Sequence, residues 1–334
     1  MPTQKTILVA LAELENGQEG DFFALLTSKE ELKTREGKPY FKVGFRDDRR
    51  AVTFPVWSDS IWGDDCRKNW SPGAFYKLRA LYRETNFGPQ LEIRKIREVI
   101  EADATDGFDP TMFQPRSRFD PLAMFNELRQ IAVERIDDPP LQALVVTLLD
   151  TNRESLLTLA AATRNHHNFV GGYLEHVLSV TRTVVLMVDK YDDYYPDLQP
   201  RLNKGLAVAG AILHDIGKLR EIDWQPEGPA YTPSGTLIGH ILQGRDIVRE
   251  AAAGSTLDAD VLLRLEHIIV SHQRLPEWGS PKPPMTPEAL IVHYADDLDA
   301  KYHMMYVALR DDPNPGAFTS KQNQLHQAVY RGKQ

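Results

Sequence analysis

The stretch Gly210 to Lys218 reads Gly-Ala-Ile-Leu-His-Asp-Ile-Gly-Lys and places a histidine directly before an aspartate at the end of an apolar run. Such a run is typical of a buried helix. Neighbouring side chains on a helix point about 100° apart, so His214 and Asp215 can bind one metal ion only where the helix ends. Gly217 is expected to supply that end. The stretch therefore predicts a metal site at a helix terminus.

A His-Asp pair alone is weak evidence, because a histidine in an apolar helix is more often a hydrogen-bonded core residue than a ligand. Further imidazole and carboxylate groups flank this pair in the sequence, at His176, His240, His272 and Asp296. Imidazole and carboxylate ligands together suit divalent manganese, iron, cobalt, nickel or zinc. The whole set favours a metal site over a packed core histidine.

The order His176, His214-Asp215 and Asp296 resembles the HD-domain superfamily of metal-dependent phosphohydrolases, and His240 and His272 resemble the added ligands of its two-metal members. Stretches between residues 160 and 305 are more narrowly similar to the YhaM-type 3′→5′ exoribonucleases. They are Asn165-His166-His167, Gly171-Gly172, Leu174-Glu175-His176, Ala211 to Lys218, Gly235 to Ile241, and, within Glu277 to Lys301, Glu-Trp-Gly-Ser-Pro, Met-Thr-Pro-Glu-Ala and Tyr-Ala-Asp-Asp-Leu-Asp-Ala-Lys.

This resemblance implies a centre of two divalent ions, with manganese preferred and cobalt, iron, nickel, zinc or magnesium as alternatives. The implied ligands are His176, His214 and Asp296 for the first ion and His240 and His272 for the second. If only one ion binds, His240 and His272 would contact substrate phosphate instead. Two cations a few ångströms apart repel strongly unless they share negative charge, so Asp215 is expected to bridge them.

Lys218 follows Asp215 by three residues and would lie on the same side of a continuing helical turn. In the family a lysine here lies close to the scissile phosphate, where a cation stabilises developing charge. The alternative is a surface lysine at a helix end. Asp215 and Lys218 are therefore the catalytic candidates. His167 precedes the flexible Gly171-Gly172 turn and is expected to contact the substrate.

With 334 residues the chain has room for two domains, and 42% hydrophobic and 26% charged residues are ordinary for a globular protein. The single cysteine, Cys66, excludes an internal disulfide framework and a cysteine-cluster zinc site. The apolar run Ile7 to Ala12 is too short for a signal peptide or a membrane span. These features predict a cytoplasmic protein without a membrane partner.

The formal net charge of −8 argues against a general polyanion binder held by bulk charge. Residues 1–105 carry 17 basic and 17 acidic side chains, so the whole deficit lies in residues 106–334. A local basic groove is therefore compatible with the neutral N-terminal part.

The predicted fold class is multidomain α+β. Residues 1–103 contain short runs at 5–14, 20–27, 40–46, 51–57, 75–83 and 90–97 that predict strands of a small all-β barrel. The segment Leu25 to Trp57 resembles an OB-fold of the single-strand-binding kind. Residues 104–119 lack periodicity and are expected to be a linker, residues 120–320 an all-α HD helical bundle, and residues 321–334 a polar tail, with a marginal helix over 319–334.

An OB-fold binds a strand by stacking bases on aromatic side chains beside basic residues. The candidates are Tyr40, Phe45, Phe54 and Trp57, with Lys38, Lys42, Arg46 and Arg49 as basic neighbours. Alternate residues of barrel strands point inward, so half of these aromatics belong to the core. Tyr40, Lys42 and Trp57 are selected as substrate-binding residues.

The features together predict a metal-dependent 3′→5′ exonuclease that degrades single-stranded RNA, with DNA as a second substrate to test. The alternative is an HD-type nucleotide or cyclic-dinucleotide phosphohydrolase in which the OB domain is a regulatory module. An inert nucleic-acid adaptor is disfavoured, because a binding module needs no such set of ligands. The family resemblance also implies a homo-oligomer.

Overall fold

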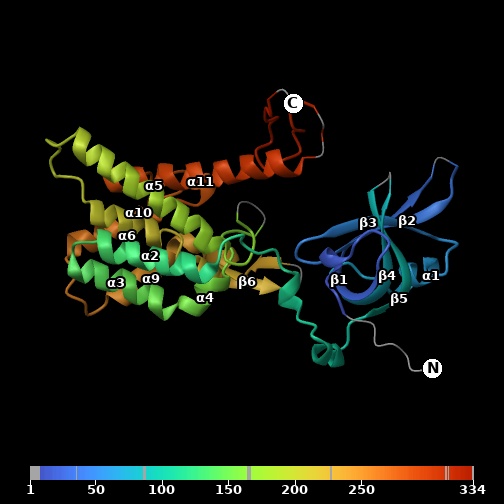
Figure 1. The fold of residues 1–334 in the computed structure, drawn as a ribbon. Helices are drawn as coiled ribbons and strands as arrows, with labels where there is room; N and C mark the ends of the chain where they lie inside the picture. Colours follow the sequence, from blue (N-terminus) through green and yellow to red (C-terminus); the bar gives the residue numbers. More distant parts are fainter. Residues whose placement is uncertain are drawn as a thin grey trace. The chain divides into compact units, whose positions relative to one another are not determined.

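The computed structural model of the protein describes residues 8–34, 36–85, 88–163, 167–225, 228–312, 314 and 316–332. Asn165 and His166, named above, lie outside these residues, as do residues 5–7 of the first predicted strand. The chain divides into two compact units, Met1–Pro115 and Arg116–Gln334, which are called the N-terminal unit and the C-terminal unit (Figure 1).

Antiparallel strands form the sheet of the N-terminal unit: β1 (Glu19–Lys33), β2 (Pro39–Arg46), β3 (Ala51–Trp57), β4 (Phe75–Thr85) and β5 (Gly88–Glu98). Their order is β3-β2-β1-β4-β5, because β1 pairs with β4 through its first half and with β2 through its second half. Helix α1 (Gly63–Asn69) joins β3 to β4, and β3 contacts β5. This OB-like arrangement confirms the predicted fold class for this part of the chain.

The predicted strand at 5–14 is wrong in its described part. Leu8 makes an isolated bridge with Asp21, and a 3₁₀ turn, η1 (Leu11–Glu13), follows. Leu11 and Leu14 are fully buried in the barrel core. The run is apolar because a turn inserts Leu11 and Leu14 into the core, and such a turn produces the same pattern as a strand.

Two further 3₁₀ turns, η2 (Glu101–Asp106) and η3 (Pro110–Phe113), follow β5. The rings of Phe108 and Phe113 pack against Phe75, at 5.3 and 5.2 Å between ring centroids. The Arg46 guanidinium donates a hydrogen bond to the carbonyl of Phe113 at 2.6 Å. The end of the N-terminal unit is therefore held against the sheet.

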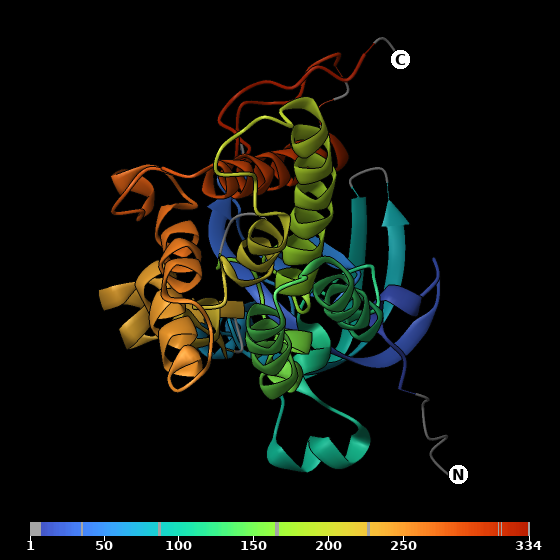
Figure 2. The ribbon, with the colours of Figure 1, turned by 90° about the vertical axis from the view of Figure 1, so that its left-hand side faces the viewer.

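The C-terminal unit is helical: α2 (Pro121–Arg135), α3 (Pro139–Thr151), α4 (Arg153–Thr158), α5 (Gly172–Tyr194), α6 (Lys204–Leu213), α7 (Lys218–Glu221), α8 (Pro233–Ile238), α9 (His240–Ala252), α10 (Ala259–Ser271) and α11 (Pro287–Asp311). A hairpin of β6 (Ile222–Gln225) and β7 (Gly228–Tyr231) interrupts this series, and a 3₁₀ turn, η4 (Pro276–Trp278), precedes α11. Helices α5 and α11 pack against each other and against α6 (Figure 2).

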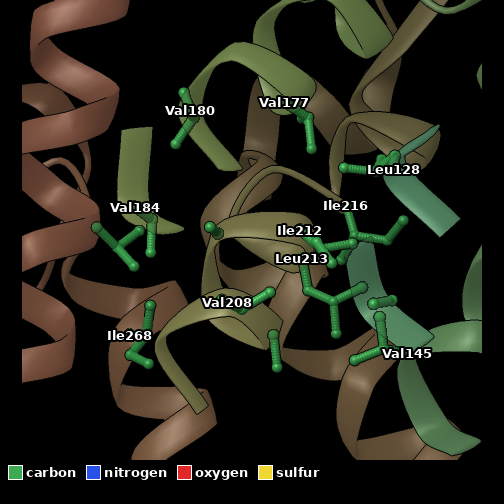
Figure 3. Packing of buried hydrophobic residues seen from close by; sticks show 14 of the residues in the cluster. Leu128, Val145, Val177, Val180, Val184, Val208, Ile212, Leu213, Ile216 and Ile268 are labelled. Carbon is green, nitrogen blue, oxygen red and sulfur yellow. The ribbon is translucent and has the colours of Figure 1, made fainter. Parts of the chain in front are cut away.

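Helix α6 is the centre of this unit, since every residue from Gly205 to Leu213 is buried. It begins where the Asn203 side chain accepts a hydrogen bond from the amide of Leu206 at 2.8 Å. Apolar side chains from α2, α3, α5 and α10 surround it (Figure 3). A helix buried on all sides explains the continuous apolar run before His214.

The helix predicted over 319–334 is wrong for the residues described there, which are extended or in turns, with a bridge between Phe318 and Tyr330. In the part of the chain that the structure describes, no helix combines the length and the apolar character needed to cross a membrane.

Candidate metal centre

The ends of α6 and α10 place two histidines in the same way. His214 follows the last residue of α6, and its Nδ1 donates to the carbonyl of Ala211 at 2.7 Å. His272 follows the last residue of α10, and its Nδ1 donates to Ile269 at 2.7 Å. Each ring thus satisfies a carbonyl left unpaired at a helix end. The opposite nitrogen, Nε2, is left as a lone-pair donor to a metal ion.

Gly217 has a φ of −64°, so it does not end α6 through a left-handed conformation. A Cβ at this position would lie 1.9 Å from the carbonyl oxygen of His240 and 2.5 Å from the amide of Gly244. The prediction that Gly217 ends the helix is therefore wrong. Its missing side chain lets the turn after Asp215 lie directly against the first turn of α9.

His240 begins α9 and is held by Glu221, the last residue of α7. The buried Glu221 carboxylate accepts hydrogen bonds from the backbone amide of His240 at 2.8 Å and from its Nδ1 at 2.9 Å. The sequence carries no signal for Glu221, because only the fold brings α7 to the start of α9. Glu221 fixes the tautomer and the orientation of the imidazole.

His176 lies in the second turn of α5 and is fully buried. Its Nδ1 donates to Asp299 of α11 at 2.7 Å, and Asp299 also accepts from Ser179 and lies 3.2 Å from Nε2 of His167. Burial opposes a charge on His176, but hydrogen bonds to Asp296 and Asp299 raise its pKa to about 10. A cation at this site would compete with that proton for Nε2.

One oxygen of Asp215 and one of Asp296 meet the Nε2 atoms of His176 and His214. Asp296 Oδ1 lies 3.2 Å from His176 Nε2 and 3.8 Å from His214 Nε2. Asp215 Oδ2 lies 3.6 and 3.5 Å from the same two atoms, which are 3.4 Å apart. Ligands about 2.1 Å from one ion in tetrahedral geometry are about 3.4 Å apart. His176, His214 and Asp215 therefore form a group that could hold one divalent cation, and Asp296 lies beside the two imidazoles.

The other oxygen of Asp215 faces a second ligand set. Asp215 Oδ1 lies 3.3 Å from His240 Nε2 and 3.6 Å from His272 Nε2. Among the described residues, none of these three atoms has a hydrogen-bond partner, although all three are buried. Unpaired buried polar atoms are rare because they are costly, and three that converge fit a second cation. Asp215 has the position of a bridging carboxylate.

Two groups of the second ligand set have the protonation state that a cation needs. Burial lowers the pKa of His272 to about 3, with a further contribution from His214, so His272 is a neutral ligand at pH 7. Burial opposes ionisation of Asp215, yet Lys218 and His214 hold its pKa well below the usual range. The lone pair of His272 and the charge of Asp215 are therefore both present at neutral pH, whereas His176 must lose its Nε2 proton when a cation binds.

Lys218 is buried at the start of α7, and its Nζ lies 2.6 Å from Asp215 Oδ2. Burial opposes its charge, but the Asp215 carboxylate raises its pKa, so the ammonium group persists. The structure therefore brings Lys218 to the centre rather than to the surface of the unit.

His167 lies beside this centre but not within it. Its Nε2 lies 3.2 Å from Asp299 Oδ2, and its ring stacks on His303 at 3.9 Å between centroids. With Arg118, Phe119 and Tyr302, among other residues, it lines a cavity of about 460 Å³. Its predicted contact with substrate is not established by this placement.

In the N-terminal unit, Tyr40 and Trp57 are opposite each other on β2 and β3, with ring centroids 5.4 Å apart. Lys42 is exposed two residues after Tyr40. Phe45 and Phe54 face the barrel core, at 0% and 5% exposure, and are therefore not available as strand contacts. The sheet thus separates the predicted aromatics into an outer pair and an inner pair.

The family model described as HD domain matches residues 173–301 of this chain. All six predicted metal ligands lie inside that range, so the C-terminal unit contains an HD domain. The presence of an HD domain supports a metal-dependent phosphohydrolase, and the His and Asp groups described above could hold a divalent cation.

Two solved structures resemble part of the chain. A crystal structure of a domain of replication protein A from Methanococcus maripaludis is 11% identical, covers 28% of this chain and 96% of its own, and has a TM-score of 0.23. The solution structure of the second OB-fold domain of that organism's replication protein A is 14% identical, with coverages of 28% and 97% and a TM-score of 0.23. Neither match carries an argument about function.

Proposed function

We propose that the protein is a metal-dependent 3′→5′ exonuclease that shortens single-stranded RNA and releases nucleoside monophosphates. The observation that carries the proposal is the convergence of two ligand sets on the two oxygens of Asp215, with the Lys218 ammonium 2.6 Å away. A pair of cations and an adjacent ammonium group would attract the negatively charged phosphodiester.

Divalent ions bound at such a centre activate water and stabilise the charge of a phosphodiester undergoing displacement. The chain's own groups would orient the reactants. Asp215 would contribute one oxygen to each ligand set, and Asp299 and Glu221 orient the rings of His176 and His240. Lys218 would donate a hydrogen bond to a phosphate oxygen as negative charge develops. The oxygen of water would bond to phosphorus as the bond from phosphorus to the 3′ oxygen of the preceding nucleotide breaks, and a proton from the water would end on that oxygen as a 3′-hydroxyl.

The outer face of β2 and β3 would hold the strand. Tyr40 and Trp57 offer aromatic surface for base stacking, and Trp57 is 38% exposed. Lys42 is exposed on the same face, and Lys38 Nζ lies 5.3 Å from the Trp57 ring centroid. Trp57→Ala is expected to raise KM for long strands and to leave cleavage of a dinucleotide unchanged, whereas exposed Ile61→Ala should change neither.

The direct test uses metal-stripped protein and a 5′-labelled single-stranded RNA, with manganese, magnesium, cobalt or zinc added in turn. Asp215→Ala is the inactive variant, and Asp192→Ala is its control, because Asp192 is another buried carboxylate of the C-terminal unit, paired with Arg201. A metal-dependent ladder that shortens from the 3′ end is expected for the wild type and for Asp192→Ala only. A ladder from Asp215→Ala would refute the proposed centre.

One observation favours the alternative, a nucleotide or cyclic-dinucleotide phosphohydrolase. Many basic side chains of the N-terminal unit pair with carboxylates, which leaves less positive charge for a phosphate backbone. They are Lys38, Arg49, Arg67, Lys77, Arg79, Arg83, Arg94 and Arg97. Hydrolysis of a nucleotide panel that depends on Asp215, without shortening of RNA under any metal, would select this alternative.

A further inference from the structure

A cavity of about 360 Å³ lies beside the metal centre. Two of its lining residues, His272 and Asp296, belong to the two ligand sets described above. The remaining wall includes Trp278, Lys301 and Met304. Its volume is within the range of about 300 to 1,000 Å³ that is usual for small-ligand sites. A molecule in this cavity would therefore lie next to the proposed catalytic ions.

Trp278 presents an aromatic surface to this cavity, with 49% of the residue exposed. It ends η4, where Gly279 adopts a φ of 102° and turns the chain. The next residue, Ser280, accepts a hydrogen bond at its Oγ from the amide of Gln273 at 3.0 Å. This hydrogen bond ties the turn that contains Trp278 to Gln273, the residue after His272. The Trp278 ring therefore has a defined position relative to the metal centre.

The rest of the lining fits a base and a phosphate. Met304 and Leu325 supply apolar surface, and Gln273 supplies an amide side chain for the edge of a base. Lys301 Nζ lies over the Trp278 ring, 5.7 Å from its centroid, and pairs with Asp297 at 2.7 Å. An aromatic ring beside an ammonium group is the combination that nucleotide-binding surfaces use for stacking and charge.

The larger cavity beside His167 is less suited to this role. It is lined by Asp299, which bonds the Nδ1 side of His176. The cavity at Trp278 is instead lined by Asp296, which lies 3.2 Å from the opposite nitrogen, Nε2. A nucleotide phosphate must reach the Nε2 side, because the two ligand sets converge there.

We propose that the cavity at Trp278 binds the terminal nucleoside monophosphate of the substrate, with its base stacked on the Trp278 ring. The inference rests on the proposed exonuclease function, since it places the 3′-terminal nucleotide beside that centre. The site recognises the base through its aromatic face, so it tolerates all bases and discriminates against a ribose phosphate that has none.

The test measures binding of adenosine 5′-monophosphate and of ribose 5-phosphate to manganese-loaded protein by calorimetry. Trp278→Ala is expected to weaken the first ligand about tenfold, the usual effect of losing one base-aromatic stack. Binding of ribose 5-phosphate should not change, and Trp278→Phe should restore most of the affinity for the nucleotide. Tyr194→Ala, which removes another exposed aromatic side chain of the same unit, is the matched control.

The same preparations are then assayed on a labelled RNA strand, so that the two proposals can fail separately. If the wild type shortens RNA but Trp278→Ala binds both ligands as the wild type does, the cavity assignment is refuted and the exonuclease stands. If the wild type shortens no strand yet binds the nucleotide through Trp278, the exonuclease fails and the nucleotide site stands. Loss of nucleotide affinity in Tyr302→Ala instead of Trp278→Ala would indicate that the base binds in the cavity beside His167.

Discussion

Replacing Asp299 with asparagine tests whether the hydrogen-bond partner of His176 controls the metal affinity of the centre. In the structure the carboxylate accepts from His176 Nδ1 at 2.7 Å and from the Ser179 hydroxyl. An asparagine keeps one oxygen for His176, and its NH₂ group can donate to Ser179. The main loss is negative charge, which makes His176 a weaker ligand.

Removing such a partner costs 10 to 100-fold in metal affinity, or about 1.4 to 2.7 kcal/mol. Asparagine keeps one hydrogen-bond acceptor for His176, so Asp299→Asn is expected to lower the metal affinity about tenfold. Asp299→Ala removes that acceptor and is expected to lower the affinity about a hundredfold. The affinity for manganese is measured by competition with a chelator. Asp192→Asn removes a buried, Arg201-paired carboxylate elsewhere in the unit and should leave the affinity unchanged. Unchanged affinity in both Asp299 variants would refute the reasoning.

Three further predictions concern other buried groups. Glu221→Ala should remove the support of His240 and weaken the second ion about tenfold or more, so bound manganese falls toward one ion per chain; an unchanged metal content would contradict this. Lys218→Met should lower kcat about a hundredfold without weakening manganese binding, whereas an effect on KM alone would exclude a catalytic role. Hydrogen bonds from Arg97 hold the pKa of Asp103 below its usual range despite burial. Asp103 therefore stabilises the N-terminal unit above about pH 4 and loses this contribution as the pH falls. Urea unfolding of Asp103→Asn should show a lower free energy of unfolding than the wild type at pH 7 and a smaller decrease as the pH falls. If the free energies of the two proteins decrease in parallel with pH, Asp103 is not the group responsible.

The helices were predictable because their caps and apolar stripes are local signals. Pro121 and Pro287, for example, each begin a helix next to a residue whose side chain caps it. The first segment of the chain was mispredicted because a turn that inserts side chains into the barrel core has the same apolar residues as a strand. The 319–334 segment was mispredicted because its polar composition does not distinguish a marginal helix from a segment held by turns.

The candidate ligand side chains of the centre came from the resemblance of the sequence to HD domains, since a His-Asp pair alone does not distinguish a ligand from a core histidine. The geometry of the ligands could not be predicted, because it depends on how α5, α6, α9, α10 and α11 pack together. Glu221 had no signal, since a glutamate at a helix end is commonly exposed. Asp299 stood in a recognisable stretch, but only the packing of α11 on α5 gives it His176 as a partner.

The close approach at Gly217 has a consequence for how the centre can change. The turn that carries Asp215 and the start of the helix that carries His240 meet through main-chain atoms, with no room for a Cβ between them. The spacing between the chain segments that carry Asp215 and His240 is thus set by the backbone. Substituting ligand side chains would change which cations these residues could hold, but a different spacing of the two segments requires both to be rebuilt together.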